Sequence, residues 1–301
     1  MRLKVTIVVL LVAITVGLVG VGLYTGLNKT PTNGPEEPQK IDCTITVMSF
    51  NVRTINFGIE KNPNDDIDLR TPLMLKQIAD ANPDVIGVQE WMFAHEGTLK
   101  EELLKTYGFV GQSRDGSFFG EMSAIFYKLD RFELVDTHTY WLSETPEKLS
   151  LGWDATIYRV CTVAYLKDKL NDKIIRFGNV HMDHIAAVAR EEGTKLVIDR
   201  AVADEYPAIQ VGDFNYDIKH PNYQYCIKNM DDTRLVAPNA FTTASYNGWR
   251  DSYIMNGGDP IDHILVTKDD FNVYSYEVLS YKVDGWFASD HFPVVAKIEL
   301  K

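Results

Sequence analysis

Apolar segments with the composition of β-strands recur along the chain from residue 44 onward. They are short, rich in Val, Ile and aromatic residues, and bounded by polar residues, Gly or Pro, which is typical of strands rather than helices. The expected strands are Thr44–Ser49, Asp84–Gln89, Ser123–Tyr127, Thr162–Leu166, Ile174–Val180, Ala208–Val211, Ile261–Val266 and Val294–Ile298.

Two segments between these strands carry apolar residues at helical spacing. They are Arg70–Ala81, in which Leu73 and Ile78 fall on one side, and Ala187–Asp204. Many strands with few helices predict an α+β fold. We expect two facing sheets flanked by helices, with the connecting loops collected at one rim.

The N-terminal segment is apolar over a longer stretch. Residues 5–24 include no charged residue, and Arg2 and Lys4 precede them. Such a run can cross the ~30 Å hydrocarbon core of a bilayer as a helix, whereas the apolar part of a cleaved signal peptide usually has ~7–15 residues. We therefore expect an uncleaved signal anchor in residues 1–27, with secretion after signal cleavage as the alternative. The preceding positive charges predict a single-pass protein of the cell membrane whose remainder lies outside the cytoplasm.

Residues 28–42 are rich in Pro, Gly and acidic residues and offer nothing to bury, so they predict a flexible stem. Residues 43–301 would then form one folded domain. The chain has 45% hydrophobic residues and a formal net charge of −12. That charge argues against a broad nucleic-acid surface, because such binding depends on Lys and Arg. The three cysteines lack the spacing of a metal site or a disulfide framework.

Polar residues that could carry chemistry follow directly on several of the expected strands. Carboxylates, amides and imidazoles gathered at strand ends can surround a divalent cation and a phosphate group. Six segments contain them: Ser49-Phe50-Asn51, Val88-Gln89-Glu90, Asn179-Val180-His181-Met182-Asp183, Gly212-Asp213-Phe214-Asn215, Ile261-Asp262-His263 and Ser289-Asp290-His291.

This ordered series resembles the endonuclease/exonuclease/phosphatase superfamily, the DNase I-like metal-dependent phosphoesterases, over roughly residues 43 to 300. One such motif alone is a weak match, but six in the expected order are specific. The phrases Tyr140-Trp-Leu-Ser-Glu-Thr-Pro146 and Gly120-Glu121 further resemble a bacterial branch of that superfamily. The resemblance implies a four-layer α/β sandwich of two mixed sheets, with the active site at the top of the sheets.

The resemblance also implies a metal site. Glu90 ends an apolar strand, where a carboxylate is costly to bury without a partner, and it is expected to be the principal ligand of Mg²⁺ or Mn²⁺. Asn51 and Asp290 are expected to complete the site, which could hold one or two ions. The nucleic-acid repair branch carries a carboxylate where this chain has Arg53. That departure weakens the case for a second ligand on the loop.

By the same resemblance, Asp213 is expected to be the general base that activates the attacking water. Asn215 lies two residues further in a segment expected to be extended, so it would point the same way and donate to the phosphate. The plain structural alternative for both residues is an Asx turn at the end of a strand.

Two histidines stand in matching contexts, and each is expected to pair with an acid. Glu121 would orient His181, and Asp262 would orient His291. A carboxylate on one ring nitrogen fixes the tautomer and stabilises the imidazolium. An isolated histidine is more often structural, but the strand-end placement of these two favours a catalytic role.

Arg159 matches a phosphate-contacting arginine of the DNase I-like group, and a guanidinium fork fits two phosphate oxygens. An ordinary arginine on a strand surface is the alternative. Asp183, His184 and Trp153 are expected to contribute to substrate binding. For His184 and Trp153, a structural role is about equally compatible with the motifs.

Three classes of function fit these residues. The first is a membrane-tethered, metal-dependent phosphomonoesterase or phosphodiesterase, which we expect to be a monomer acting on a phosphoester of unidentified leaving group. The second is a secreted nuclease, but the segment Trp91–Glu96 contains no Arg or Lys to reach into a groove, so duplex DNA is not the expected substrate. The third is a non-catalytic phosphate-binding module, which would be expected to have lost Glu90, Asp213 or His291.

Overall fold

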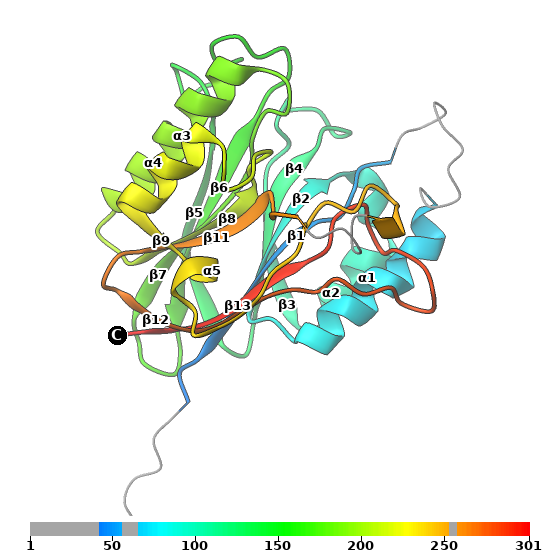
Figure 1. The fold of residues 1–301 in the computed structure, drawn as a ribbon. Coiled ribbons are helices and arrows are strands. Elements are labelled where there is room, and N and C mark those ends of the chain that lie inside the picture. The colour runs from blue at the N-terminus through cyan, green and yellow to red at the C-terminus, as the bar shows by residue number, and fades with distance from the viewer. Residues whose placement is uncertain (1–41, 56–65, 253–257) are drawn as a thin grey trace, which may run out of the picture. The chain divides into compact units, whose positions relative to one another are not determined.

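The computed structural model describes residues 42–55, 66–252 and 258–301. Within these ranges the chain forms two mixed β-sheets that face each other (Figure 1). The seven-stranded sheet has the order β10 (Asn239–Phe241), β12 (Phe271–Val278), β13 (Val294–Leu300), β1 (Ile45–Asn51), β2 (Val85–Trp91), β4 (Met122–Lys128) and β3 (Tyr107–Val110). The six-stranded sheet has the order β5 (Phe132–Trp141), β6 (Val160–Asp168), β7 (Ile174–His181), β8 (Ala208–Asp213), β11 (Asp262–Thr267) and β9 (Met230–Asp232).

Helices cover the outer face of each sheet, so the fold has four layers (Figure 1). The helices α1 (Ile67–Ala81) and α2 (Thr98–Leu103) pack on the seven-stranded sheet. The helices α3 (Ala187–Val202) and α4 (Pro221–Asn229) pack on the six-stranded sheet. The short helices η2 (Phe93–His95) and α5 (Thr233–Val236) complete the described elements.

The central strands are apolar along their whole length because both of their faces are buried. Val47 and Met48 of β1 are fully buried neighbours, yet they belong to different cores. Val47 joins the core between the sheets, where it lies with residues such as Phe177 and Ile209. Met48 joins the core under α1 with Leu73. Successive strand side chains point to opposite faces, so one sheet supports both layers.

A buried polar contact joins the two sheets beneath the strand ends. The Gln89 side-chain amide donates to Oδ1 of Asn179 at 2.6 Å, and Asn179 donates to the backbone oxygens of Val88 at 2.8 Å and Ala124 at 2.7 Å. Gly87 allows this approach, because a Cβ there would lie 2.3 Å from a methyl group of Val211. This contact fixes the separation of the two sheets where their polar ends meet.

Two pairs of parallel strands bring the polar motifs to one edge. In the first sheet β1 and β2 are parallel, and Asn51 pairs with Gln89. In the second sheet β7 and β8 are parallel, and His181 pairs with Asp213. The antiparallel β11 begins at the same edge, where Asp262 pairs with Asp213. The topology therefore collects residues that are distant in sequence into one place.

The eight expected strands and both expected helices are confirmed, with ends that differ by one to a few residues. Several elements lie outside the prediction, including β5, β12 and α4. In β5 most side chains are partly or fully exposed, so its sequence lacks a clear apolar pattern.

The expected anchor in residues 1–27 lies outside the described residues, as does the expected stem except for Asp42. Among the helices of the described ranges, none combines the length and apolar character needed to cross a bilayer. The anchor, the stem and the domain limit at residue 43 therefore stay predictions.

Candidate active site

The polar edge of the two sheets surrounds a cavity of about 450 Å³. Most of its lining residues are of charged or polar type, and many of them lie at or just after the ends of β1, β2, β7 and β8 or just before β11 and β13. The lining residues are Arg53, Thr54, Glu90, Arg114, Glu121, Ile157, Arg159, His181, His184, Asp213, Asn215, Tyr246, Ile261, Asp290 and His291.

Three of the lining residues have left-handed backbone conformations that non-glycine residues seldom adopt. The φ angles are 56° at Arg53, 59° at Glu90 and 55° at Asn215. Glu90 lies in an irregularity of the β2–β4 pairing between Val88 and Trp91. Such conformations cost energy and concentrate at functional sites. Here all three residues line the cavity.

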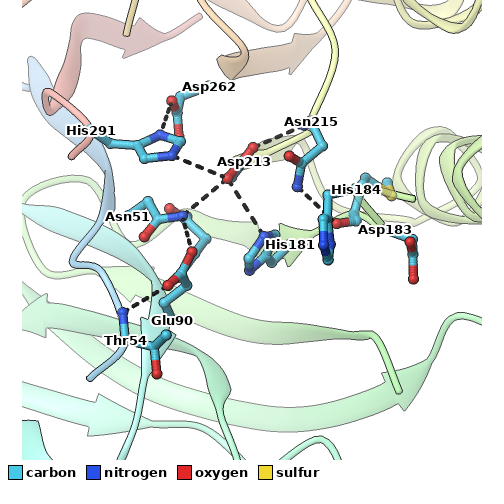
Figure 2. A network of polar contacts seen from close by, with 12 residues as sticks. Asn51, Thr54, Glu90, His181, Asp183, His184, Asp213, Asn215, Asp262 and His291 are labelled. Carbon is cyan, nitrogen blue, oxygen red and sulfur yellow. Dashed lines mark hydrogen bonds and ion pairs between the residues drawn. The ribbon is translucent and has the colours of Figure 1, made fainter. Parts of the chain in front are cut away.

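Asp213 is at the centre of the polar network (Figure 2). Its Oδ2 accepts a hydrogen bond of 3.0 Å from the side-chain amide of Asn51. The same oxygen lies 3.5 Å from Nε2 of His181 and 3.7 Å from Nε2 of His291. Burial raises the pKa of Asp213 to about 7, with a further contribution from Asp262 and opposition from His291. A carboxylate with that pKa can take up a proton near neutral pH.

His291 is held by Asp262, as the sequence predicts. Nδ1 of His291 donates to Oδ2 of Asp262 at 2.8 Å, and both residues are buried. Burial alone would lower the pKa of His291, but the carboxylates of Asp262 and Asp213 outweigh it and raise the pKa to about 10. The imidazolium is therefore the stable form at neutral pH. Its ring also meets that of Tyr246 edge to face, with centroids 5.1 Å apart.

His181 is placed in the cavity as expected, but its environment differs from that of His291. Burial and the nearby positive charges of Arg159 and Arg114 hold the pKa of His181 well below its usual value. The neutral imidazole is therefore the stable form, and it can donate one hydrogen bond without carrying charge.

Glu90 and Asn51 are brought together at the ends of β1 and β2. The Asn51 side chain donates to Oε1 of Glu90 at 3.0 Å, and the backbone N–H of Thr54 donates to Oε2 at 2.7 Å (Figure 2). Burial opposes ionisation of Glu90, but these two hydrogen bonds and the charge of Arg53 lower its pKa. Glu90 is thus kept as a carboxylate in a buried position.

Asp290 lies close enough to Glu90 for their negative charges to interact. Burial raises the pKa of Asp290, and the charge of Glu90 raises it further. Arg53 offsets part of this repulsion from 3.4 Å. Buried like charges of this kind are stabilised by a cation, and carboxylate and amide oxygens suit a hard divalent ion. Glu90, Asn51 and Asp290 thus fit the metal site that the sequence predicts.

A second grouping could also hold a metal ion. Ligand atoms of Asp213, Asp262 and His291 all lie within 4.8 Å of one another. The 2.8 Å contact between His291 and Asp262 is, however, already a hydrogen bond through the ring N–H. The ring is an imidazolium at neutral pH, so a metal on either of its nitrogens would have to displace a proton. This favours the carboxylates around Glu90 as the main ligands.

Arg159 lines the cavity, and its guanidinium is only partly hydrogen-bonded. Its side chain is 5% exposed, one Nη lies 3.0 Å from Nδ1 of His184, and its Nε is 3.8 Å from Asp183. Its Nε and remaining Nη have no hydrogen-bond partner within the described part of the chain. Burial and the charge of Arg114 lower the pKa of Arg159. A buried guanidinium that lines a cavity is suited to an anion.

The expected pairing of Glu121 with His181 is wrong. Glu121 lines the cavity, but both of its carboxylate oxygens accept from the guanidinium of Arg114, at 2.8 and 2.9 Å. A bidentate ion pair of this kind is stronger than a single hydrogen bond to a neutral imidazole. The His181 ring instead faces Asp213, whose Oδ2 lies 3.5 Å from Nε2 of the ring.

The expected extended run from Asp213 to Asn215 is also wrong. The strand β8 ends at Asp213, and Asn215 is left-handed. Its backbone N–H donates to Oδ1 of Asp213 at 2.9 Å, and its side-chain amide donates to the backbone oxygen of Met182 at 3.0 Å (Figure 2). Asn215 therefore faces the cavity through an Asx turn rather than through strand alternation.

Two residues expected to bind substrate have structural contacts instead. Trp153 packs against the core under α3, and its backbone N–H donates to Glu144. The neighbouring Asp154 accepts from the backbone N–H groups of Val188 and Ala189 at 3.2 and 2.7 Å, so it caps the start of α3.

Asp183 similarly accepts from backbone N–H groups of the loop that follows it. Its link to the cavity is the contact with Arg159.

Sequence reasoning missed several cavity residues. Arg114 and Tyr246 lie in loops, and only folding of the chain brings these loops to the site. Arg114 is brought to Glu121 by a tight loop, with the Arg114 N–H donating to the Glu121 backbone oxygen at 2.9 Å. An arginine shortly before Gly120-Glu121 is the signal that could have indicated this ion pair.

Comparison with known proteins places these observations in context. Residues 48–291 match the model of the endonuclease/exonuclease/phosphatase family. No curated protein matches the chain.

Several solved structures are similar over nearly their whole length. An endonuclease/exonuclease/phosphatase family protein from Bacteroides thetaiotaomicron is 33% identical, with a TM-score of 0.79 over 86% of this chain and 98% of that chain. A mannosyl-6-phosphatase from Bacteroides thetaiotaomicron VPI-5482 is 34% identical, with a TM-score of 0.76 over 85% and 99%. An endonuclease/exonuclease/phosphatase protein from Bacteroides vulgatus is 29% identical, with a TM-score of 0.78 over 86% and 99%.

Proposed function

Because the chain belongs to the endonuclease/exonuclease/phosphatase family, we propose that it is a divalent-metal-dependent phosphoester hydrolase that acts on sugar phosphate monoesters. One observation carries the hydrolytic part of this proposal. The buried Asp213 carboxylate lies among Asn51, His181 and the His291 imidazolium, facing a cavity that also contains Glu90. A base, a charged donor and metal ligands therefore meet in one place.

The metal is proposed to be Mg²⁺ or Mn²⁺, held by Glu90, Asn51 and Asp290. When bound, it would polarise the phosphate and offset charge that develops on the leaving oxygen. The protein prepares this role: the Thr54 backbone N–H and the Asn51 side chain keep Glu90 ionised and oriented through the two hydrogen bonds described above.

Asp213 is proposed to orient the attacking water and take its proton. Its pKa of about 7 lies near the pH at which a general base is most effective. The hydrogen bond from Asn51 and the one from the backbone of Asn215 fix the two carboxylate oxygens. Contacts from both sheets thus position the Asp213 carboxylate and influence its pKa.

The phosphate oxygens are proposed to be stabilised by His291, His181 and Arg159. The His291 imidazolium supplies a fixed positive charge, and Asp262 holds the ring in place. His181 supplies a neutral N–H, and Arg159 supplies the donors that have no described partner. Preorganised donors aimed at developing charge are a large contribution to catalysis.

Two observations support a monoester. The cavity is lined by the buried Arg159 and by the His291 imidazolium, and a terminal phosphate presents more charge and more acceptor oxygens than a diester. In addition, the 34% identical relative is named a mannosyl-6-phosphatase. Together they support a phosphorylated sugar as the substrate class.

A panel assay tests this proposal. The full-length protein, in detergent with Mg²⁺ or Mn²⁺, would be given mannose 6-phosphate, other sugar phosphates, bis(p-nitrophenyl) phosphate and duplex DNA. We expect the highest kcat/KM with a sugar phosphate. A higher kcat/KM with the diester or with DNA would contradict the monoester proposal.

We further propose that the protein is a monomer tethered to the cell membrane through residues 1–27, with the catalytic domain outside the cytoplasm. The charge pattern of the N-terminal segment supports this. Fractionation of cells that produce the full-length chain, followed by carbonate washing, would keep it with the membranes. Recovery of a shortened, soluble chain in the medium would instead indicate signal cleavage.

A further inference from the structure

Three phenylalanines form an exposed aromatic cluster, Phe93, Phe118 and Phe119. Their ring centroids are 4.7 Å apart for Phe93 and Phe118, 5.6 Å for Phe93 and Phe119, and 5.3 Å for Phe118 and Phe119. The residues are nevertheless 41%, 68% and 63% exposed. The rings thus support one another while most of the surface of Phe118 and Phe119 faces solvent.

The two segments that carry the aromatic cluster adjoin residues that line the active-site cavity, although the three phenylalanines are not among the lining residues. Phe93 follows the proposed metal ligand Glu90 by three residues, and Phe119 precedes the cavity residue Glu121 by two. Both segments leave the cavity wall and meet through the ring contacts. The aromatic cluster is therefore within three residues of the cavity wall along both segments.

The loop that carries Phe118 and Phe119 is well defined. Its two ends are joined by the bridge between Ser113 and Met122. Within it, Oδ1 of Asp115 accepts from Oγ of Ser113 and from the N–H of Ser117, both at 2.8 Å. Gly120 leaves room for this turn, because a Cβ there would lie 2.1 Å from the same Asp115 oxygen. The rings are consequently positioned before any ligand arrives, which reduces the entropic cost of binding.

We propose that the aromatic cluster is a subsite for the sugar ring of the substrate, and this proposal rests on the function proposed above. The C–H face of a pyranose is apolar and weakly positive, so it packs favourably on the negative face of an aromatic ring. The cavity would hold the phosphate and its metal, and the exposed rings of Phe118 and Phe119 would hold the saccharide that leaves.

The charges near the aromatic cluster favour a neutral saccharide over an anionic bilayer. The loop contains the acids Asp115 and Glu121, and its one cation, Arg114, is paired with Glu121. A surface that docks on anionic lipid usually surrounds its apolar residues with Lys and Arg.

The test compares two variants of the full-length protein. The double variant Phe118→Ser/Phe119→Ser removes the exposed rings, and Phe241→Ser removes a phenylalanine that is 71% exposed on β10. Both would be assayed with mannose 6-phosphate and with the acyclic glycerol 3-phosphate. We expect the double variant to raise KM for the sugar phosphate roughly fivefold or more. KM for glycerol phosphate should stay unchanged, and Phe241→Ser should affect neither substrate.

An unchanged KM for the sugar phosphate, or an equal rise for both substrates, would overturn the subsite. If the KM values are unchanged but the double variant loses a rate response to phosphatidylglycerol vesicles, the rings face a bilayer and the proposal is wrong.

A second measurement separates the subsite from the proposed function. Saturation-transfer NMR with methyl α-mannoside should show contact with aromatic protons that the double variant lacks, even if no phosphoester is hydrolysed. Equal transfer in both proteins would also overturn the subsite.

Discussion

Oδ2 of Asp262 lies 2.8 Å from Nδ1 of His291, and the opposite ring nitrogen of His291 lies 3.7 Å from Asp213. The acid therefore orients the imidazolium toward the proposed general base. All three residues are buried, so their charges interact strongly.

This relationship predicts the effect of Asp262→Asn. The amide keeps the size of the side chain but removes the charge that stabilises the imidazolium, so we expect kcat to fall by roughly 10–100-fold with little change in KM. Steady-state kinetics measure this, and thermal unfolding checks that the fold persists. Asp136→Asn, at an exposed position of β5, is the control and should retain normal activity. A normal kcat in a folded Asp262→Asn protein would remove this pair from the mechanism.

The contact between the sheets predicts a stability effect. Asn179→Ala would leave the Val88 and Ala124 backbone oxygens and the Gln89 amide without their buried partner. We expect the free energy of unfolding to fall by about 2–4 kcal/mol, as measured by urea denaturation. Asn272→Ala, on an exposed position of β12, should cost less than about 0.5 kcal/mol. Equal stability of the two variants would contradict the role of this contact.

His95 predicts a pH dependence of stability. Burial, together with the charge of Arg70, lowers the pKa of His95 to about 4, and its Nδ1 accepts from the backbone N–H of Met92 at 3.1 Å. Between pH 6.5 and 4 the unfolded chain binds a proton at His95 that the folded chain does not. The free energy of unfolding should therefore decrease as the pH falls through this range, by up to about 3 kcal/mol from this residue.

Urea denaturation at several pH values measures this dependence. Because Gln does not titrate but retains an acceptor, His95→Gln should show a smaller loss of stability between pH 6.5 and 4 than the unmodified protein. An identical slope in both proteins would show that His95 is not kept neutral by the fold.

The net charge of −12 predicts a weak and shallow response to salt. A protein that grips several phosphates of duplex DNA loses affinity with a log–log slope near −0.9 per phosphate contacted. We expect duplex DNA to be a poor substrate and kcat/KM for the preferred substrate to vary little between ~50 and ~200 mM salt. Steep loss of DNA cleavage over this range, with DNA as the best substrate, would favour a nuclease.

Much of the site was predictable because its residues follow apolar strands. Asn51, His181 and Asp213 are the last residues of mostly apolar strands, and Glu90 is the last but one of β2. The ends of a parallel pair of strands meet at one edge. The order of the motifs then indicated the family, and the family resemblance indicated the proposed roles of these residues.

What the sequence did not predict depends on contacts between loops. Glu121 was expected to pair with His181. Its carboxylate instead accepts from Arg114, which a tight loop brings close to it. Trp153 was assigned to the substrate, but the start of α3 lacks a side-chain cap of its own. Asp154 supplies that cap, and Trp153 is drawn into the core beside it. Neither the ion pair of Arg114 with Glu121 nor the capping of α3 by Asp154 produces a periodic pattern in the sequence.

The most direct test of the proposed chemistry is phosphate release by the EDTA-treated protein, measured before and after addition of Mg²⁺ or Mn²⁺, for the unmodified chain and for Glu90→Gln. The variant keeps an acceptor for the Thr54 N–H but removes the charge that would bind the cation. We predict that release from mannose 6-phosphate stops with EDTA and returns with either metal. Glu90→Gln should need at least ~10-fold more metal for half of its maximal rate. Full phosphate release in the presence of EDTA, or an unchanged metal requirement in Glu90→Gln, would contradict a metal-dependent hydrolase built on this carboxylate.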